Sequence, residues 1–244
     1  MHNYKIVIEY DGTNFVGWQQ QENGQSIQSA LQEALIKLSN EKVTIFGAGR
    51  TDAGVHAYGQ VASFNLNKKI ETDVIRDGLN QHLRPLPIAV QEAQIVDENF
   101  HARFSAKKRW YEYKIFNRRP PLTIDLNRAW CVHKNLDIEK MKIESSAFIG
   151  KHDFNAFRSA HCQSKNSIKT IDSISIKSKG EQIIFEVSAK SFLHSQVRIM
   201  IGTLVDIAKG NINKTVLDII NSKQREVAGQ TAPAHGLYLK KINY

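Results

Sequence analysis

The residues with the clearest chemical capacity form one short block, Gly49-Arg50-Thr51-Asp52-Ala53-Gly54-Val55-His56. Glycines at 47, 49 and 54 surround an arginine, a carboxylate and a histidine within ten positions. Loops held by rigid strands often carry chemistry. An ionised aspartate in such a loop can act as a nucleophile or as a base, so Asp52 is the candidate catalytic residue.

This block has two other interpretations. Gly47-Ala48-Gly49 after a strand resembles the start of a dinucleotide-binding GxGxxG turn, but Asp52 occupies the third glycine position and no helical period follows. A carboxylate there would repel a pyrophosphate at a helix N-terminus. The other interpretation is structural: Asp52 bonds the backbone of a tight glycine turn, as aspartate often does.

A second candidate segment is the basic and aromatic run 107–114, Lys-Lys-Arg-Trp-Tyr-Glu-Tyr-Lys. In a strand, Arg109, Tyr111 and Tyr113 share one face. Alternating cations and rings suit a polyanion whose unstacked bases need aromatic platforms. The same pattern fits a half-buried strand whose tyrosines fill a core, and the sequence does not choose between the two.

The third candidate is Arg198, which follows Phe192-Leu-His-Ser-Gln-Val and lies beside an apolar stripe at helical spacing. Such an arginine is usually an exposed surface residue. In the first turn of a helix it opposes the helix dipole slightly. Its position is easier to understand if it meets a carboxylate.

The composition limits the class of protein. The 244 residues carry a formal net charge of +9, which suits a phosphate-rich partner, although a basic balance is also common in soluble proteins. Two cysteines without a CxxC pair, and histidines without an HExxH motif, indicate no metal site. The first residues lack a signal-peptide pattern, and no apolar run approaches the roughly 18 residues of a membrane helix. We therefore expect a soluble, cytoplasmic protein that makes no membrane contact.

The hydrophobic pattern predicts an α+β protein. Ser26, Thr72 and Asp137 are the expected helix caps. Strands are predicted over 5–10, 42–46, 55–64, 88–96, 110–116, 168–176, 183–189 and 237–242, and helices over 27–38, 73–83, 138–149, 194–209 and 215–221.

This order predicts two ferredoxin-like β-α-β-β-α-β halves, residues 1–104 and 105–244. Their sheets would join into one largely antiparallel sheet with helices on one face. Asp52 belongs to the first half, and Tyr111 and Arg198 belong to the second, so the active-site cleft is expected between the halves.

Over nearly its whole length the chain resembles the bacterial tRNA pseudouridine synthase A family. The resemblance rests on Tyr10-Asp-Gly-Thr13, Gly17-Trp-Gln19, Gly49-Arg-Thr-Asp-Ala-Gly-Val-His-Ala57, Phe100-His-Ala-Arg-Phe-Ser105, Arg109-Trp-Tyr-Glu-Tyr113, Phe192-Leu-His-Ser-Gln-Val-Arg198 and Ala234-His-Gly-Leu-Tyr-Leu239. It implies conversion of uridine to pseudouridine at tRNA positions 38, 39 and 40 of the anticodon stem-loop, by a homodimer without a cofactor.

The resemblance also assigns roles to residues. It implies that Asp52 is the catalytic aspartate, Tyr111 the active-site tyrosine and Arg198 the arginine that partners the aspartate. We expect Arg50 to fill the gap left by a flipped-out nucleotide or to hold a nearby phosphate. Outside the pocket, the expected phosphate contacts are Lys107, Lys108, Arg118, Arg119 and Lys165.

Two rival functions stay open at this point. A non-catalytic RNA-binding module would use the aromatic sheet face but leaves the Asp52 loop unexplained. A glycoside or nucleoside hydrolase would need a second carboxylate as general acid, and the sequence shows no obvious one near Asp52.

Overall fold

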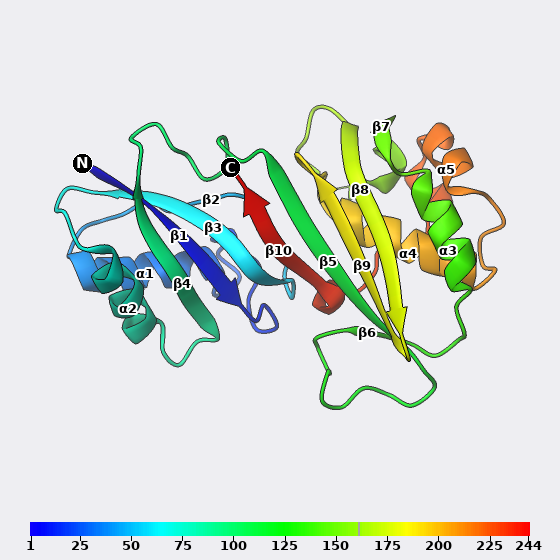
Figure 1. Cartoon of the computed structure of the whole chain (residues 1–244), viewed down its shortest axis with the longest axis horizontal. Helices are drawn as coiled ribbons and strands as arrows, with labels where there is room; N and C mark the ends of the chain where they lie inside the picture. Colours follow the sequence, from blue (N-terminus) through cyan, green and yellow to red (C-terminus); the bar gives the residue numbers. More distant parts are fainter. Residues whose placement is uncertain (161) are drawn as a thin grey trace. The chain divides into compact units, whose positions relative to one another are not determined.

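The chain forms two compact units in a computed structural model that describes residues 1–160 and 162–244 (Figure 1). Unit 1 contains Met1–Lys107 together with Tyr238–Tyr244, and unit 2 contains Lys108–Leu237. The sequence predicted two contiguous segments, 1–104 and 105–244. In the structure the C-terminal strand is grouped with unit 1 instead, so that unit is discontinuous in sequence. The predicted α+β class with mostly antiparallel strands is confirmed.

Unit 1 has the predicted order of elements, strand, helix, strand, strand, helix, strand. These elements are β1 (His2–Tyr10), α1 (Ile27–Ser39), β2 (Phe46–Gly47), β3 (His56–Leu66), α2 (Thr72–Leu83) and β4 (Ile88–Val96), with β10 (Leu237–Asn243) added from the end of the chain. β1 lies between β4 and β3, and both β2 and β10 pair with β3. β2 is opposite Ala62 and Ser63, whereas β10 is opposite His56 and Ala57, so the two short pairings occupy different parts of β3.

The two helices of unit 1 lie side by side against one face of its sheet (Figure 1). α1 buries Ile27, Leu31 and Leu35, and alternate residues of β1 are buried with them. The Ser26 cap is confirmed, because its side chain accepts a hydrogen bond from the Ser29 backbone N–H. The Thr72 cap is wrong by one position: Thr72 is the first helical residue, and Glu71 precedes it without a side-chain capping bond.

The strand predicted over 42–46 is reduced to Phe46–Gly47. Val43 and Ile45 are buried, as their types predict. Their carbonyl oxygens, however, accept hydrogen bonds from the amides of Gln32 and Gln28 on α1, at 3.1 and 2.9 Å. Because side chains of the helix satisfy this backbone, the segment needs no neighbouring strand.

A second, smaller core covers the other face of the unit 1 sheet. Ala48, Val61 and Ala102 form it, and Val7, which alternates with the helix-facing Ile6 and Ile8, packs against it. The segment 97–107 crosses this face. Its Ala102 is anchored on both sides, because its N–H donates to Ser63 Oγ and its carbonyl accepts from the Tyr244 hydroxyl.

Unit 2 is built on the strand order β5-β9-β8-β7, with the short β6 parallel to β5. Its elements are β5 (Lys108–Asn117), β6 (Trp130–Val132), α3 (Ile138–Ser146), β7 (Gly150–Asp153), η1 (Asn155–Phe157), β8 (Ile168–Lys179), β9 (Gln182–Ala189), α4 (Gln196–Ala208), α5 (Val216–Ser222), η2 (Arg225–Val227) and η3 (Ala234–Gly236).

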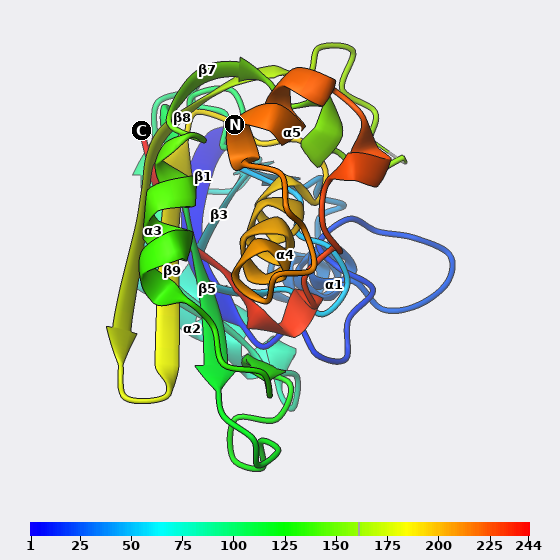
Figure 2. The same ribbon diagram turned by 90° about the vertical axis from the view of Figure 1, so that its right-hand side faces the viewer.

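The sequence predicted the long elements of unit 2 and missed β6 and β7, which have three and four residues. The Asp137 cap of α3 is confirmed, since its side chain accepts from the Lys140 N–H. Both views place α4 against one face of strands β5 and β9 (Figures 1 and 2). Within the described part of the chain, no helix is long and apolar enough to cross a membrane.

Candidate active site

The Asp52 loop connects β2 to β3 as a hydrogen-bonded turn. The Val55 N–H donates to the Asp52 carbonyl oxygen at 3.1 Å, and Gly54 has a φ of +78°. A positive φ at the third position of such a turn favours glycine. The chain then enters strand β3 instead of a helix, so the dinucleotide-binding interpretation is excluded by the local fold. The Asp52 side chain is half-buried at this turn.

Residues 10–18, which we call the strap, tie this loop down. The hydroxyl groups of Tyr10 and Thr51 are 2.8 Å apart. The Trp18 N–H donates to the Thr51 carbonyl oxygen at 3.0 Å. The residue directly before Asp52 is therefore held through its side chain and through its backbone.

Gly17 explains how closely the strap approaches the loop. A Cβ atom at this position would lie 2.6 Å from the Thr51 carbonyl oxygen and 3.1 Å from the Ala53 nitrogen. Gly17 also has a φ of +108°, which L side chains rarely adopt. Only glycine satisfies both the close approach and the backbone conformation.

His56 and Asp11 close the far end of the loop. His56 is 2% exposed, and its Nδ1 accepts the Gly12 N–H at 3.0 Å and lies 3.2 Å from Asp11 Oδ1. Its ring stacks on Tyr238 of β10, with the centroids 4.7 Å apart. Sequence reasoning included both residues in the family motifs but assigned them no role. Asp11 is a second carboxylate near the loop, and it also accepts the Thr13 N–H at 3.0 Å.

Arg50 lies on the exposed side of the same loop, two positions before Asp52. The backbone leading to it is fixed, because Gln60 donates from its side chain to the Gly49 carbonyl oxygen at 2.8 Å, and the Ala48 N–H donates to Val61. The loop thus presents an arginine at the surface and a half-buried carboxylate from one immobilised backbone.

Tyr111 lies on β5 in unit 2 and is 8% exposed. Its ring meets Phe192 edge to face, with the centroids 5.2 Å apart and the planes at 87°. Its strand neighbour Tyr113 is fully buried and donates from its hydroxyl to the Pro233 carbonyl oxygen at 2.8 Å. Burial raises the pKa of Tyr113 well above its usual value, against the opposing effect of the Arg198 charge. This face of β5 is therefore core at Tyr113, as the structural interpretation predicted.

Arg198 lies in the first turn of α4, where its backbone and side chain both bond Ala232. Its Nε donates to the Ala232 carbonyl oxygen at 2.8 Å, and the Ala232 N–H donates to the Arg198 carbonyl oxygen at 3.1 Å. The guanidinium is consequently fixed on its Nε side. A carboxylate that pairs with two of its nitrogens would use the two Nη atoms.

The predicted site residues thus fall into two pairs. Arg50 and Asp52 belong to one loop of unit 1, and Tyr111 and Arg198 belong to β5 and α4 of unit 2. The meeting of Asp52 with Tyr111 and Arg198 stays a prediction.

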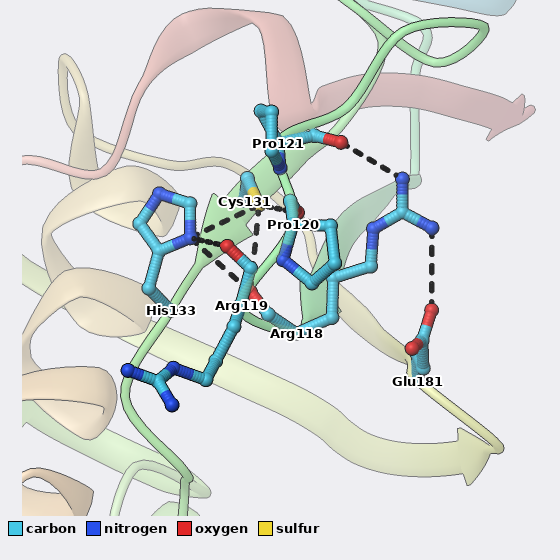
Figure 3. A network of polar contacts seen from close by, with 7 residues as sticks. All are labelled: Arg118, Arg119, Pro120, Pro121, Cys131, His133 and Glu181. Atoms are coloured by element: carbon cyan, nitrogen blue, oxygen red, sulfur yellow. Dashed lines mark hydrogen bonds and ion pairs between the residues drawn. The ribbon is translucent and has the colours of Figure 1, made fainter.

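A basic loop after β5 carries two of the predicted phosphate contacts (Figure 3). Arg118 is engaged within the protein, since it pairs with Glu181 at 3.3 Å and donates to the Pro121 carbonyl oxygen at 3.0 Å. The guanidinium of Arg119 points away from this network and makes no ion pair with any residue that the structure describes. The Arg119 backbone is held instead, because its carbonyl oxygen accepts from His133 Nδ1 at 2.9 Å.

Cys131 and His133 belong to this network and do not form a metal site. The Cys131 Sγ is 3.6 Å from the Pro120 carbonyl oxygen and 3.8 Å from His133 Nδ1. Since His133 Nδ1 donates to a carbonyl, it is not available as a ligand in this arrangement. No cluster of three or more ligand-type side chains occurs among residues 1–160 and 162–244.

The Asp52 loop has a fixed backbone, and the net charge of +9 favours association with a polyanion. A family model described as tRNA pseudouridine synthase matches residues 6–105 and 145–244. The chain belongs to this family of isomerases.

Relatives that match the chain over its full length support the same family assignment. A tRNA pseudouridine synthase A of Ehrlichia chaffeensis is 52% identical over 244 residues, and one of Wolbachia pipientis wMel is 50% identical over 243, each match covering 99% of both chains. A tRNA pseudouridine synthase A of Afipia carboxidovorans is 48% identical over 247 aligned positions that cover both chains completely. The predicted class, an isomerase that modifies tRNA, is confirmed.

Proposed function

We propose that this chain converts uridine to pseudouridine at positions 38, 39 and 40 of the tRNA anticodon stem-loop, with Asp52 as the catalytic carboxylate. The observation that carries the proposal is the attachment of the Asp52 loop to the strap at Thr51 and His56. A carboxylate that must meet one sugar atom needs such a fixed backbone, because misplacement by about 1 Å costs on the order of 100-fold in rate.

The reaction requires the C1′–N1 bond to break and a C1′–C5 bond to form. In one route an Asp52 oxygen attacks C1′ and uracil departs with the N1 electron pair; C5 then attacks C1′ and the carboxylate leaves. In the other route Asp52 takes the C2′ proton, the C2′–H electrons form the C1′=C2′ bond of a glycal, and uracil departs with the N1 electron pair. The proton then returns to C2′ as C5 attacks C1′. Both routes end with loss of the C5 proton and protonation of N1, and both begin with an ionised Asp52.

Arg198 is proposed to keep Asp52 ionised by pairing through its Nη atoms. An adjacent guanidinium favours the charged form of a carboxyl group. The Ala232 bonds support this role, because an arginine already fixed on one side loses little conformational entropy when it pairs on the other.

Tyr111 is proposed to stack on the flipped-out uracil, and Phe192, which meets the Tyr111 ring edge to face, supports its position. Flipping a base out of a stem costs a few kcal/mol, and stacking on an aromatic ring returns about 1–3 kcal/mol. Arg50, on the exposed side of the loop, is proposed to fill the gap in the stem or to hold its phosphate.

We further propose that the enzyme is a cytoplasmic homodimer in which one tRNA contacts both subunits. This assembly is what the family resemblance implies, and the excess of basic residues supports a phosphate-rich partner. Sedimentation of the protein with and without tRNA measures whether two subunits associate and whether one tRNA binds the pair.

Mapping pseudouridine in an unmodified tRNA after incubation with the wild type and with Asp52→Asn tests the function. The proposal predicts pseudouridine at positions 38 to 40 from the wild type and none from the variant, which should still bind tRNA. Free uracil would instead indicate a hydrolase, and binding without modification would indicate a non-catalytic RNA-binding module.

A further inference from the structure

Three aromatic side chains form a continuous row on the surface of unit 1. The ring of His101 lies 4.9 Å from that of Phe46 and 4.5 Å from that of Phe104, measured between centroids. Phe46 is 43% exposed and Phe104 is 76% exposed. This aromatic row (Phe46, His101 and Phe104) contributes little to the core, and contiguous exposed apolar groups mark interaction sites.

The row is presented by a rigid turn. Ala102 lies between its two loop members and is completely buried, with both of its backbone groups bonded to side chains of the unit. The turn also closes on itself, because the Ser105 N–H donates to the His101 carbonyl oxygen and Ser105 Oγ accepts the His101 N–H. Rigid presentation lowers the entropy lost when a ligand binds.

The polar groups of His101 and of the neighbouring Arg103 can interact with a nucleotide. His101 Nδ1 accepts the Arg103 N–H at 3.1 Å, so Nε2 carries the ring proton in the neutral histidine and can donate to a base. The Arg103 guanidinium lies 5.5 Å from the Phe104 ring centroid. Aromatic faces beside a cation are the combination that binds unpaired bases and their phosphates.

The row also lies close to the catalytic loop along the chain. Phe46 lies six positions before Asp52 in the sequence, and both residues belong to unit 1. Six residues span at most about 20 Å. The ring-to-ring steps from Phe46 to His101 and from His101 to Phe104 add 4.9 and 4.5 Å, and the whole path equals the rise of about nine stacked nucleotides.

We propose that the aromatic row binds an unpaired nucleobase of the substrate RNA, within about nine nucleotides of the isomerised uridine. The base stacks on the exposed face of Phe104, and His101 donates to its edge. This inference rests on the proposed function, since it places a second base-binding site beside the catalytic one.

Phe104→Ala tests the row, with Phe104→Tyr as the conservative variant and Val74→Ala as the control. Val74 is a similarly exposed apolar residue on α2. Stacking predicts that Phe104→Ala weakens binding of an unmodified tRNA by about 5- to 100-fold, while Phe104→Tyr and Val74→Ala stay within about twofold of wild type. Melting temperatures of all four proteins should agree, because the ring is largely outside the core.

A set of stem-loop RNAs, each with one loop nucleotide made abasic, locates the base. At one position the missing base should weaken binding to the wild type and not to Phe104→Ala. If no abasic position weakens binding to the wild type more than to Phe104→Ala, the proposal is overturned. It is also overturned if Phe104→Ala changes its oligomeric mass without RNA, because the row would then belong to a protein interface. If the wild type forms no pseudouridine in intact tRNA, the proposed function is wrong. If the wild type is active but Phe104→Ala binds RNA as tightly as the wild type, only the proposal for the aromatic row is wrong.

Discussion

The hydroxyl of Tyr10 lies 2.8 Å from that of Thr51, joining the end of the first strand to the residue directly before Asp52. Both residues are buried. The contact couples a sheet position to a loop position forty-one residues away. Its effect on activity is expected to come through the orientation of Asp52.

Thr51→Val should therefore lower kcat by about tenfold or more while leaving the Kd for tRNA nearly unchanged. The variant also removes one buried hydroxyl–hydroxyl hydrogen bond, at a cost of about 0.5–1.5 kcal/mol in the free energy of unfolding. Single-turnover rates and urea unfolding measure the two effects. In the double variant Tyr10→Phe/Thr51→Val, the stability loss should be smaller than the sum of the single losses. Strict additivity would mean that the two hydroxyls do not interact.

Gly17→Ala should disturb the same loop from the other side. Its Cβ would overlap the Thr51 carbonyl oxygen, and its backbone conformation would be strained. We expect a loss of about 1–3 kcal/mol in stability and a lower kcat. Gly180→Ala is the matched control, since Gly180 has a positive φ but no atom within 4 Å of an added Cβ. Equal effects of both substitutions on kcat would refute the close-approach argument.

Arg198→Lys keeps the positive charge and removes the planar fork. A lysine can bond Ala232 or a carboxylate as a point charge but cannot hold both in the arginine geometry. We expect kcat/KM to fall by about 10- to 100-fold with little change in tRNA binding. Wild-type turnover by this variant would remove Arg198 from the proposed site.

Arg119 and Arg118 allow a matched test of phosphate binding. Both substitutions to alanine remove one charge, but Arg118 is paired with Glu181 whereas Arg119 points outward. Arg119→Ala should reduce the slope of log Kd against log salt by about 1, and Arg118→Ala should change it less. Identical slopes for wild type and Arg119→Ala would exclude a phosphate contact there.

Asp153 should contribute to stability at neutral pH and not in acid. The hydrogen bond from the Ser167 hydroxyl, with help from the Asn155 N–H and Lys223, lowers the pKa of Asp153. A group whose folded pKa is lowered stabilises the protein above its unfolded pKa of about 3.9, and the contribution is lost as pH falls through the folded pKa. The difference in urea midpoint between wild type and Asp153→Asn should therefore shrink from pH 7 to pH 3. If the difference in urea midpoint were the same at pH 7 and pH 3, Asp153 would not have a lowered pKa in the folded protein.

Local patterns were enough to predict most elements of the fold. Ser26 and Asp137 were recognisable as caps because a cap depends on residues only three positions away. The segment 42–46 was misjudged because the glutamines that satisfy its carbonyls lie on α1, and no local pattern reports that. The strands of β6 and β7 are too short to have a measurable period.

The candidate site shows the same division. Asp52 stood out because glycines, an arginine and a histidine surround it in sequence. The contacts of Asp11 and Tyr10 with its loop span more than forty residues and follow from strand pairing, which spacing alone does not reveal. The aromatic row was also hidden, since Phe46 and His101 belong to segments far apart in the chain.

The position of β10 bears on how the protein is made. The strand that stacks Tyr238 on His56 follows all of unit 2 in the chain, so a ribosome has translated unit 2 before it supplies that strand. Domains generally fold as they emerge from the ribosome, but unit 1 cannot add strand β10 until unit 2 has been translated. A nascent chain therefore carries the aspartate turn before Tyr238 is available to cover His56 at the end of that turn.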